Sequence, residues 1–182
     1  MPERGPDGLL LPYPDEAVRR IIADYTVVFA CRLPHYQASV AGGRVVRAFT
    51  HEGADFNLGP VIQLGVWADD QLVGACSFER DISFEVDEGW GPAWVVQSLF
   101  VHPDHQHRGI GTLMLRTLRQ LTGLPLAEDT QMSRASADLW SKLRDELGRA
   151  SDPDTNIPLP VATFRKAVNT LVTDATTRYQ EV

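Results

Sequence analysis

The part of the sequence best suited to bind an anion combines two glycines, an arginine and a hydroxyl residue at the start of a helical pattern. Its members are Gln106, His107, Arg108, Gly109, Ile110, Gly111 and Thr112. The first N–H groups of a helix have no intrahelical acceptor and lie at the positive end of the helix dipole, so they attract phosphates. Two glycines remove Cβ atoms where a pyrophosphate would approach, and Arg108 and Thr112 add a positive charge and a donor. Since a Gly-x-Gly pair can also be only a tight turn, the flanking elements decide between the two interpretations.

Those flanking elements are a strand before the segment and a helix after it. Residues 94–101 are an apolar run rich in β-branched and aromatic residues, which indicates a buried strand. Pro103 ends the run because it has no N–H for a sheet ladder. After the glycines, apolar side chains form one helical stripe: Ile110, Leu113, Met114, Leu118 and Leu121. The sequence therefore predicts a strand, a glycine-bearing loop and a helix.

Residues 99–111, which read LFVHPDHQHRGIG, resemble the acetyl-CoA signature of the GNAT superfamily of N-acetyltransferases. That signature is a strand with an apolar end, a short loop with proline, and Gln/Arg-x-x-Gly-x-Gly/Ala at a helix start. The resemblance is specific over residues 94–120 and weaker over residues 60–147. It implies an α/β (α+β) fold with a mixed, largely antiparallel sheet that is flanked by helices and split beside the acetyl-CoA strand.

The resemblance also implies a cofactor and a reaction. Acetyl-CoA would be the acyl donor, with its pantetheine arm along Leu99, Phe100 and Val101 and its pyrophosphate on residues 106–112. The acetyl group would pass directly to a primary amine of a small molecule or peptide in a ternary complex. The alternative is a catalytically inactive acyl-CoA-binding domain with a sensing or interaction role.

The sequence departs from the family pattern at two catalytic positions. Where many members have a glutamate two residues before a Leu-x-Val segment that ends the strand, here Leu99 to Val101, this chain has Gln97, which cannot accept a proton. Where many have a tyrosine seven residues into a later helix, it has Trp140, whose indole N–H is no proton donor at neutral pH. Glu79, on the preceding predicted strand, is the best substitute base, and Glu85 or Asp87 follow.

Candidate substrate residues come from a predicted first helix and from an acidic segment. Tyr25 and Phe29 lie on a helix over residues 15–33, which in the GNAT arrangement would form one wall of the acceptor cleft. Glu85 and Asp87 lie in a predicted loop, residues 81–92, where a substrate amine would approach. Trp140 is a further candidate. Core packing and solvated surface charge are the competing interpretations.

The remaining elements follow from local patterns. Residues 61–68 and 71–80 predict an antiparallel hairpin closed by Asp69 and Asp70, with Glu79 on the face of the small residues Ala75 and Ser77. Residues 37–60 read as turns around a short apolar piece, 45–49. Residues 124–127 are a short apolar segment, residues 133–147 predict a helix that Gly148 ends, and residues 8–11 are a short strand or an arm.

The chain divides into a GNAT-like domain, residues 1–150, and a C-terminal part, residues 151–182. Residues 151–160 contain three prolines and predict a linker. Residues 161–179 predict an amphipathic helix, which either covers the sheet or packs on a second subunit of a homodimer.

Composition excludes several other functions. A formal net charge of −7 over 182 residues disfavours nucleic-acid binding. We expect a cytoplasmic protein, because the sequence contains no membrane span or secretory signal and Cys31 and Cys76 lack a CxxC spacing. His102, His105 and His107 are close together, but no fourth ligand has suitable spacing, so no metal is expected.

Overall fold

The protein is described by a computed structural model that covers residues 3–54, 59–128, 133–149 and 157–181. These residues build a six-stranded sheet in the order β1-β2-β3-β4-β5-β6. The first four strand pairs are antiparallel and the last, between β5 and β6, is parallel. The strands are β1 (Tyr36–Val40), β2 (Arg44–His51), β3 (Val61–Ala68), β4 (Gln71–Glu79), β5 (Trp94–Val101) and β6 (Leu126–Ala127). The predicted mixed, largely antiparallel sheet is confirmed.

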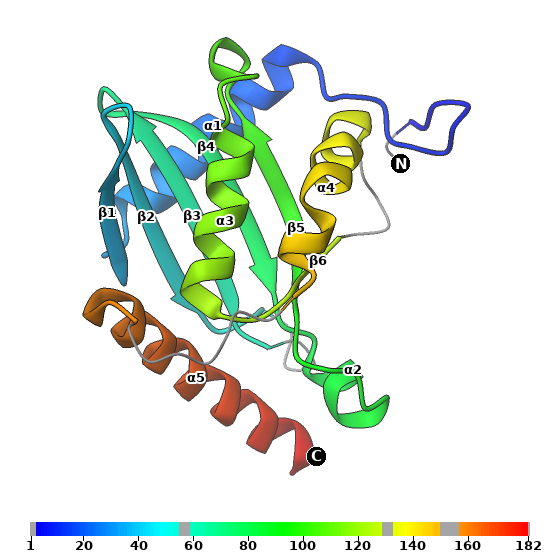
Figure 1. The fold of residues 1–182 in the computed structure, drawn as a ribbon, viewed down its shortest axis with the longest axis vertical. Coiled ribbons are helices and arrows are strands. Elements are labelled where there is room, and N and C mark those ends of the chain that lie inside the picture. The colour runs from blue at the N-terminus through cyan, green and yellow to red at the C-terminus, as the bar shows by residue number, and fades with distance from the viewer. Residues whose placement is uncertain (1–2, 55–58, 129–132, 150–156, 182) are drawn as a thin grey trace.

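Helices cover both faces of the sheet and one of its ends. Figure 1 shows α3 (Ile110–Thr122) and α4 (Arg134–Leu147) in front of the sheet, with α1 (Asp15–Ala30) behind it. The longest helix, α5 (Leu159–Gln180), crosses the lower end beside the short α2 (Ile82–Asp87). The main hydrophobic core lies between the sheet and α3, α4 and α5, and a second core lies between the sheet and α1.

Two hairpins form the antiparallel part of the sheet. The predicted hairpin of β3 and β4 is confirmed, and both of its turn residues, Asp69 and Asp70, have positive φ, as a tight hairpin turn requires. The prediction of turns around a short apolar piece over residues 37–60 holds for the turn at Gly42 and Gly43 and for residues 45–49, which lie in β2. It missed β1, which pairs with β2 in a second hairpin. Along β1, half-buried side chains alternate with exposed polar ones, so the strand has no continuous apolar run.

A β-bulge on β4 changes which side chains share a face. The register between β3 and β4 shifts at Val66 and Trp67. As a result Leu72 packs with Ala75 in the core beneath α1, and Val73 packs with Cys76 in the main core, which is the opposite of what strict alternation along β4 would give. From Ala75 onward the alternation holds, so Ser77 and Glu79 share the α1 face with Ala75.

The segment predicted as an acidic loop contains a helix. Asp81 accepts a hydrogen bond from the N–H of Phe84 at 3.2 Å and so caps the first turn of α2. The prediction of a loop over residues 81–92 was therefore wrong for Ile82–Asp87. The helix is held against α5, where Asp87 accepts a hydrogen bond from Tyr179.

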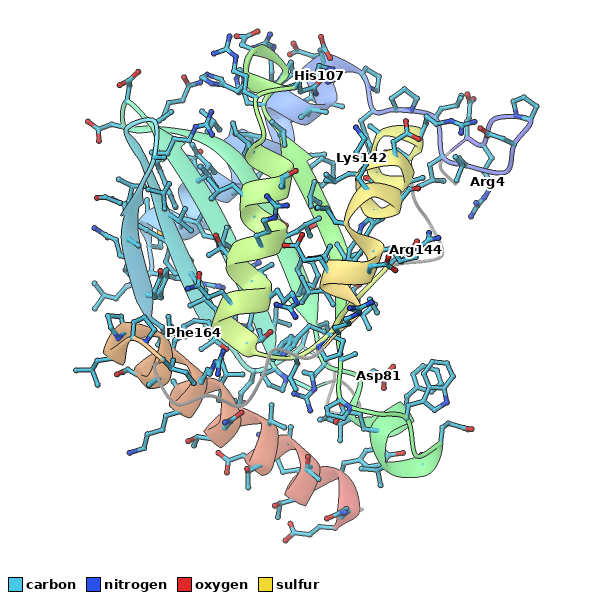
Figure 2. The ribbon with its side chains drawn as sticks, viewed as in Figure 1. Arg4, Asp81, His107, Lys142, Arg144 and Phe164 are labelled. Carbon is cyan, nitrogen blue, oxygen red and sulfur yellow. The ribbon has the colours of Figure 1, made fainter. Side chains whose placement is uncertain are left out.

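Helix α5 is docked on the same chain. Phe164 lies on α5, at the lower end of the sheet (Figure 2). It is completely buried, and its ring meets Tyr36 of β1 at a centroid distance of 6.4 Å. Val161, Val168 and Ala175 are also buried. Residues 151–156 of the predicted linker lie outside the described residues. No helix in the described part of the chain is long and apolar enough to cross a membrane.

Candidate acetyl-CoA and acceptor site

The N-terminus of α3 leaves three backbone donors without an intrahelical acceptor. Gly109 precedes the helix with φ +78° and provides no side-chain cap. The first helical hydrogen bond runs from the N–H of Leu113 to the carbonyl of Gly109, at 2.9 Å. The N–H groups of Ile110, Gly111 and Thr112 come before it, at the positive end of the helix. This is the geometry that binds phosphate oxygens.

The two glycines of this segment have different roles. A Cβ on Gly109 would meet no atom within 4 Å, so glycine is needed there for the positive φ and leaves open space beside the helix start. A Cβ on Gly111 would lie 2.9 Å from Cδ2 of Leu139, on α4. Gly111 therefore permits close packing of α3 against α4, a role that the sequence analysis did not foresee.

The loop before α3 is fixed by a cluster of polar side chains. Arg19, from α1, donates to both carboxylate oxygens of Asp104, at 2.8 and 3.2 Å. The buried His102 ring accepts a hydrogen bond at Nδ1 from the N–H of Asp104, at 3.2 Å. Burial, and then the charge of Arg19, lower the pKa of His102, while the hydrogen bond from Arg19 lowers the pKa of Asp104. The loop conformation thus depends on a neutral His102 and an ionised Asp104.

A second arginine reaches the loop from the other hairpin. Arg44, at the start of β2, donates from Nη2 to the backbone carbonyl of Arg108 at 3.1 Å. The side chains of Arg44 and Arg108 therefore provide two guanidinium groups near the uncapped helix start. Arg44 was not predicted as a site residue because it comes 64 residues earlier, in a segment that was predicted to be turns. No local spacing signal could have identified it.

Strand β5 has an open edge that leads to this helix start. Among the described residues, only Trp94 and Val95 of β5 pair with β6, so the sheet splits beyond them, as predicted. The N–H of His102 donates to Val73 of β4 at 2.8 Å, which directs the N–H and carbonyl of Val101 to the opposite, open edge. By the same alternation, the backbone of Leu99 faces the open edge and that of Phe100 faces β4.

The end of this open edge is marked by Gln106 and by a bulge. Gln106 donates from Nε2 to the carbonyl of Val101 at 3.3 Å, which connects the strand to the loop. At the other end, the register shift opposite Ser77 makes Gln97 an extra, exposed residue on β5. An extended molecule that follows the open edge from Gln106 would thus end beside Gln97 and Ser98.

Several hydroxyl and carboxyl groups lie on the α1 face beside this bulge. Tyr25, from α1, makes a hydrogen bond of 2.7 Å with the side-chain oxygen of Ser98. Ser77 is directly opposite Ser98 in the sheet, and Glu79 lies two residues further along β4 on the same face. Burial raises the pKa of the Tyr25 phenol, and the hydrogen bond with Ser98 partly offsets this rise. Phe29, by contrast, is only 4% exposed and stacks on Phe49 in the core.

The other candidate substrate residues are engaged elsewhere. Glu85 forms two hydrogen bonds, of 2.6 and 2.8 Å, with the buried Arg80, whose guanidinium lies over the ring of Trp94. Asp87 pairs with Tyr179 of α5. Trp140 is only 2% exposed and belongs to the main core. Of the five substrate candidates, Tyr25 is the one whose polar group lies beside the bulge, on the same face of the sheet as the predicted base Glu79.

The histidines of the loop do not assemble a metal site in the described residues. His102 is turned inward, whereas His107 is exposed at the upper end of the molecule, at the turn before α3 (Figure 2). Over residues 3–54, 59–128, 133–149 and 157–181, no group of three potential ligands is positioned to hold a metal ion. A surface hollow lies along α5, between Ile157 and Asp174, and contains none of the candidate residues.

Comparison with solved structures gives partial matches at low sequence identity. An aminoglycoside acetyltransferase from an uncultured soil metagenomic sample is 21% identical, with a TM-score of 0.40; the match covers 54% of this chain and 66% of that one. The ribosomal-protein-alanine N-acetyltransferase from Brucella melitensis biovar Abortus 2308 is 22% identical, with a TM-score of 0.37 and coverages of 54% and 68%. The aminoglycoside N-acetyltransferase AAC(6')-Iy in complex with CoA is 14% identical, with a TM-score of 0.41 and coverages of 79% and 87%.

Comparison with family models is more specific. No curated protein matches the chain. The model of the acetyltransferase (GNAT) domain matches residues 63–143, which extend from β3 into α4 and include the open strand edge and the uncapped start of α3. The segment from β3 into α4 is therefore similar to a GNAT acetyltransferase domain.

Proposed function

We propose that this protein is an N-acetyltransferase that moves an acetyl group from acetyl-CoA to a primary amine of a small molecule or peptide. The observation that carries the proposal is the open edge of β5 leading to the uncapped N-terminus of α3, within the segment that matches the GNAT domain. An extended thioester with a pyrophosphate at its far end fits both features, because one offers strand-like backbone groups and the other offers three N–H donors.

Each part of acetyl-CoA has proposed partners. The pantetheine arm pairs with the backbone of Leu99 and Val101 and passes Phe100. The pyrophosphate accepts hydrogen bonds from the N–H groups at the start of α3. Its charge is balanced by two guanidinium groups, from Arg108 and from Arg44. The full proposed set is Leu99, Phe100, Val101, Gln106, His107, Arg108, Gly109, Ile110, Gly111 and Thr112, with Arg44 added.

The proposed transfer is direct and uses Glu79 as the general base. Glu79 is half-buried on the α1 face, where it can take the proton that the attacking amine loses. Gln97 is exposed at the bulge and can orient the amine by hydrogen bonds. Direct transfer is supported by the state of Cys76, which is fully buried so that desolvation raises its pKa and keeps it a thiol.

A cytoplasmic location stays a prediction, which the free cysteines Cys31 and Cys76 support. A homodimer through α5 also stays a prediction.

A second candidate function is an acyl-CoA-binding domain without turnover. It is favoured by Gln97, which cannot act as a base, and by the burial of Trp140 at the position where the family often has a tyrosine. Both functions require acetyl-CoA binding, and only the first requires release of CoA when an amine is supplied.

A thiol-release assay tests the proposal. Acetyl-CoA is mixed with the protein and with polyamines, aminoglycosides, amino acids or peptides with free amino termini, and free CoA thiol is recorded. For an amine that supports turnover, Glu79→Gln should lower kcat by about 100- to 10,000-fold and leave the affinity for acetyl-CoA unchanged. Glu88→Gln is the matched control, because Glu88 is exposed at the end of α2.

The outcomes separate the alternatives. Binding of acetyl-CoA without thiol release for every amine class would support the inactive domain. Full activity of Glu79→Gln at all pH values would remove Glu79 as the base. The absence of both binding and thiol release would contradict both functions.

A further inference from the structure

Two hydroxyl groups from different elements meet beside the bulge of β5. The phenol of Tyr25, on α1, and the side chain of Ser98, on β5, are joined by the hydrogen bond of 2.7 Å. Ser98 directly follows the bulge residue Gln97, at the end of the open edge. The pair therefore lies where the reactive end of a thioester would lie if its arm followed that edge.

The position of the pair follows from the packing of α1. Ile22 and Phe29 are buried in the second core, and Tyr25 lies between them on the same helical stripe. Its ring is packed 5.4 Å from that of Phe29, so only the hydroxyl reaches the strand. Core packing accounts for the ring of Tyr25 but not for its hydroxyl, which extends to a serine that is itself only half-buried.

We infer that Ser98 is a catalytic residue that gives a proton to the departing CoA sulfur, and that Tyr25 is a positioning residue that supplies the proton to Ser98. This inference rests on the proposed function. A serine hydroxyl has one proton to donate and can accept a hydrogen bond at the same time. Tyr25 can therefore donate to Ser98 while the Ser98 proton points toward the sulfur.

The proton and electron balance of the step is complete. The amine nitrogen forms a bond with the carbonyl carbon, the carbon–sulfur bond breaks, and its electron pair stays on sulfur. Sulfur takes the proton of Ser98, and Ser98 takes the proton of Tyr25. The proton lost by the amine, accepted by Glu79, returns to the tyrosinate through solvent. The net products are an amide and CoA with a free thiol.

The surroundings of Tyr25 keep it in the donor form. The described groups that bear on its ionisation are Ser98 on β5 and the buried thiol of Cys76 on β4. Burial is the largest effect and raises the pKa of the phenol above its usual value near 10, so the proton is present throughout the neutral range. The ionisation of Tyr25 should therefore make activity decline on the alkaline side, where the phenol loses its proton.

Four variants test the inference, with kcat, KM and acetyl-CoA affinity measured for each. Ser98→Ala and Tyr25→Phe should each lower kcat by about 100-fold or more, with the affinity for acetyl-CoA within about twofold of the wild type. Ser98→Thr keeps a hydroxyl and should recover most of kcat. Tyr13→Phe is the control, because Tyr13 is an exposed tyrosine whose ring packs edge-on against Phe100.

A second measurement separates proton supply from packing. Replacement of Tyr25 by a fluorotyrosine, whose phenol has a lower pKa, should shift the alkaline decline of kcat to lower pH. If Tyr25 only packs against Phe29, the decline will stay in place. An unshifted profile, or full kcat in Tyr25→Phe or Ser98→Ala, would overturn the inference and leave the proposed function intact. A wild-type protein that releases no thiol with any amine would overturn both.

Discussion

Substitution of Gly74 by alanine should displace the proposed phosphate-binding helix. Gly74 lies on β4 beneath the first turn of α3. A Cβ there would come within 2.6 Å of Cγ2 of Ile110, and within 3.2 and 3.3 Å of Cε and Sδ of Met114. The methionine end can move, but Cγ2 of Ile110 is attached directly at Cβ, and this side chain is only 2% exposed. The added methyl group must therefore push the helix start away from the sheet.

The expected change in the free energy of unfolding of Gly74→Ala follows from two opposing contributions. Overpacking a closed core site costs about 1–3 kcal/mol. Replacing glycine by alanine stabilises by about 0.4–1 kcal/mol through the unfolded chain. We expect Gly74→Ala to reduce the free energy of unfolding by about 1–2 kcal/mol. The affinity for acetyl-CoA should fall by about tenfold or more, which corresponds to about 1.4 kcal/mol, because the N–H groups of Ile110 and its neighbours move.

Urea unfolding and calorimetry with acetyl-CoA measure the two effects. Gly91→Ala is the matched control, since a Cβ at the exposed Gly91 would meet nothing within 4 Å. Adding Ile110→Leu to Gly74→Ala removes the methyl group at the closest contact and should recover part of both losses, which appears as coupling in a double-mutant cycle. If Gly74→Ala matches Gly91→Ala in stability and in affinity, the close packing of α3 on β4 does not position the site.

Two further predictions concern the loop and the C-terminal helix. Folding lowers the pKa of His102, so as the pH falls the unfolded chain takes up a proton at this residue before the folded chain does. The stabilisation by neutral His102 is therefore present above about pH 6.5 and is lost as the pH falls below it. His102→Asn, which retains an acceptor for the N–H of Asp104, should flatten this decline in urea titrations between pH 5 and 7. Phe164→Ala should reduce the free energy of unfolding by about 3–5 kcal/mol and lower Tm, because Phe164 is completely buried. Lys166 is exposed, so the control Lys166→Ala should change the free energy of unfolding by less than about 0.5 kcal/mol. Equal effects of the two substitutions would mean that α5 is not docked as described.

The best predicted part of the molecule was the strand, loop and helix around Pro103. All three have local signals: a β-branched run, a proline and a helical stripe. The structure accordingly begins and ends β5 at the predicted residues, and α3 begins at Ile110. The hairpin of β3 and β4 was equally clear because Asp69 and Asp70 mark its turn.

The parts that were not predicted depend on contacts between distant segments. Strand β1 is a half-exposed edge strand, which pairs through its backbone and needs no apolar run. The bulge that exchanges the faces of Leu72 and Val73 is a property of strand pairing. In the site, Arg19 and Arg44 reach the loop from 85 and 64 residues away. The partnership of Tyr25 with Ser98 spans 73 residues, so spacing could nominate Tyr25 but could not identify its partner.

The central claim, that acetyl-CoA binds along the open edge of β5 and at the start of α3, can be tested on the unmodified protein. Backbone amide chemical shifts are recorded by NMR during a titration with acetyl-CoA. The structure predicts the largest changes at the amides of Leu99 and Val101 and at those of Ile110, Gly111 and Thr112. Shifts confined to other surfaces, such as the hollow along α5, or no shifts at millimolar acetyl-CoA, would contradict it.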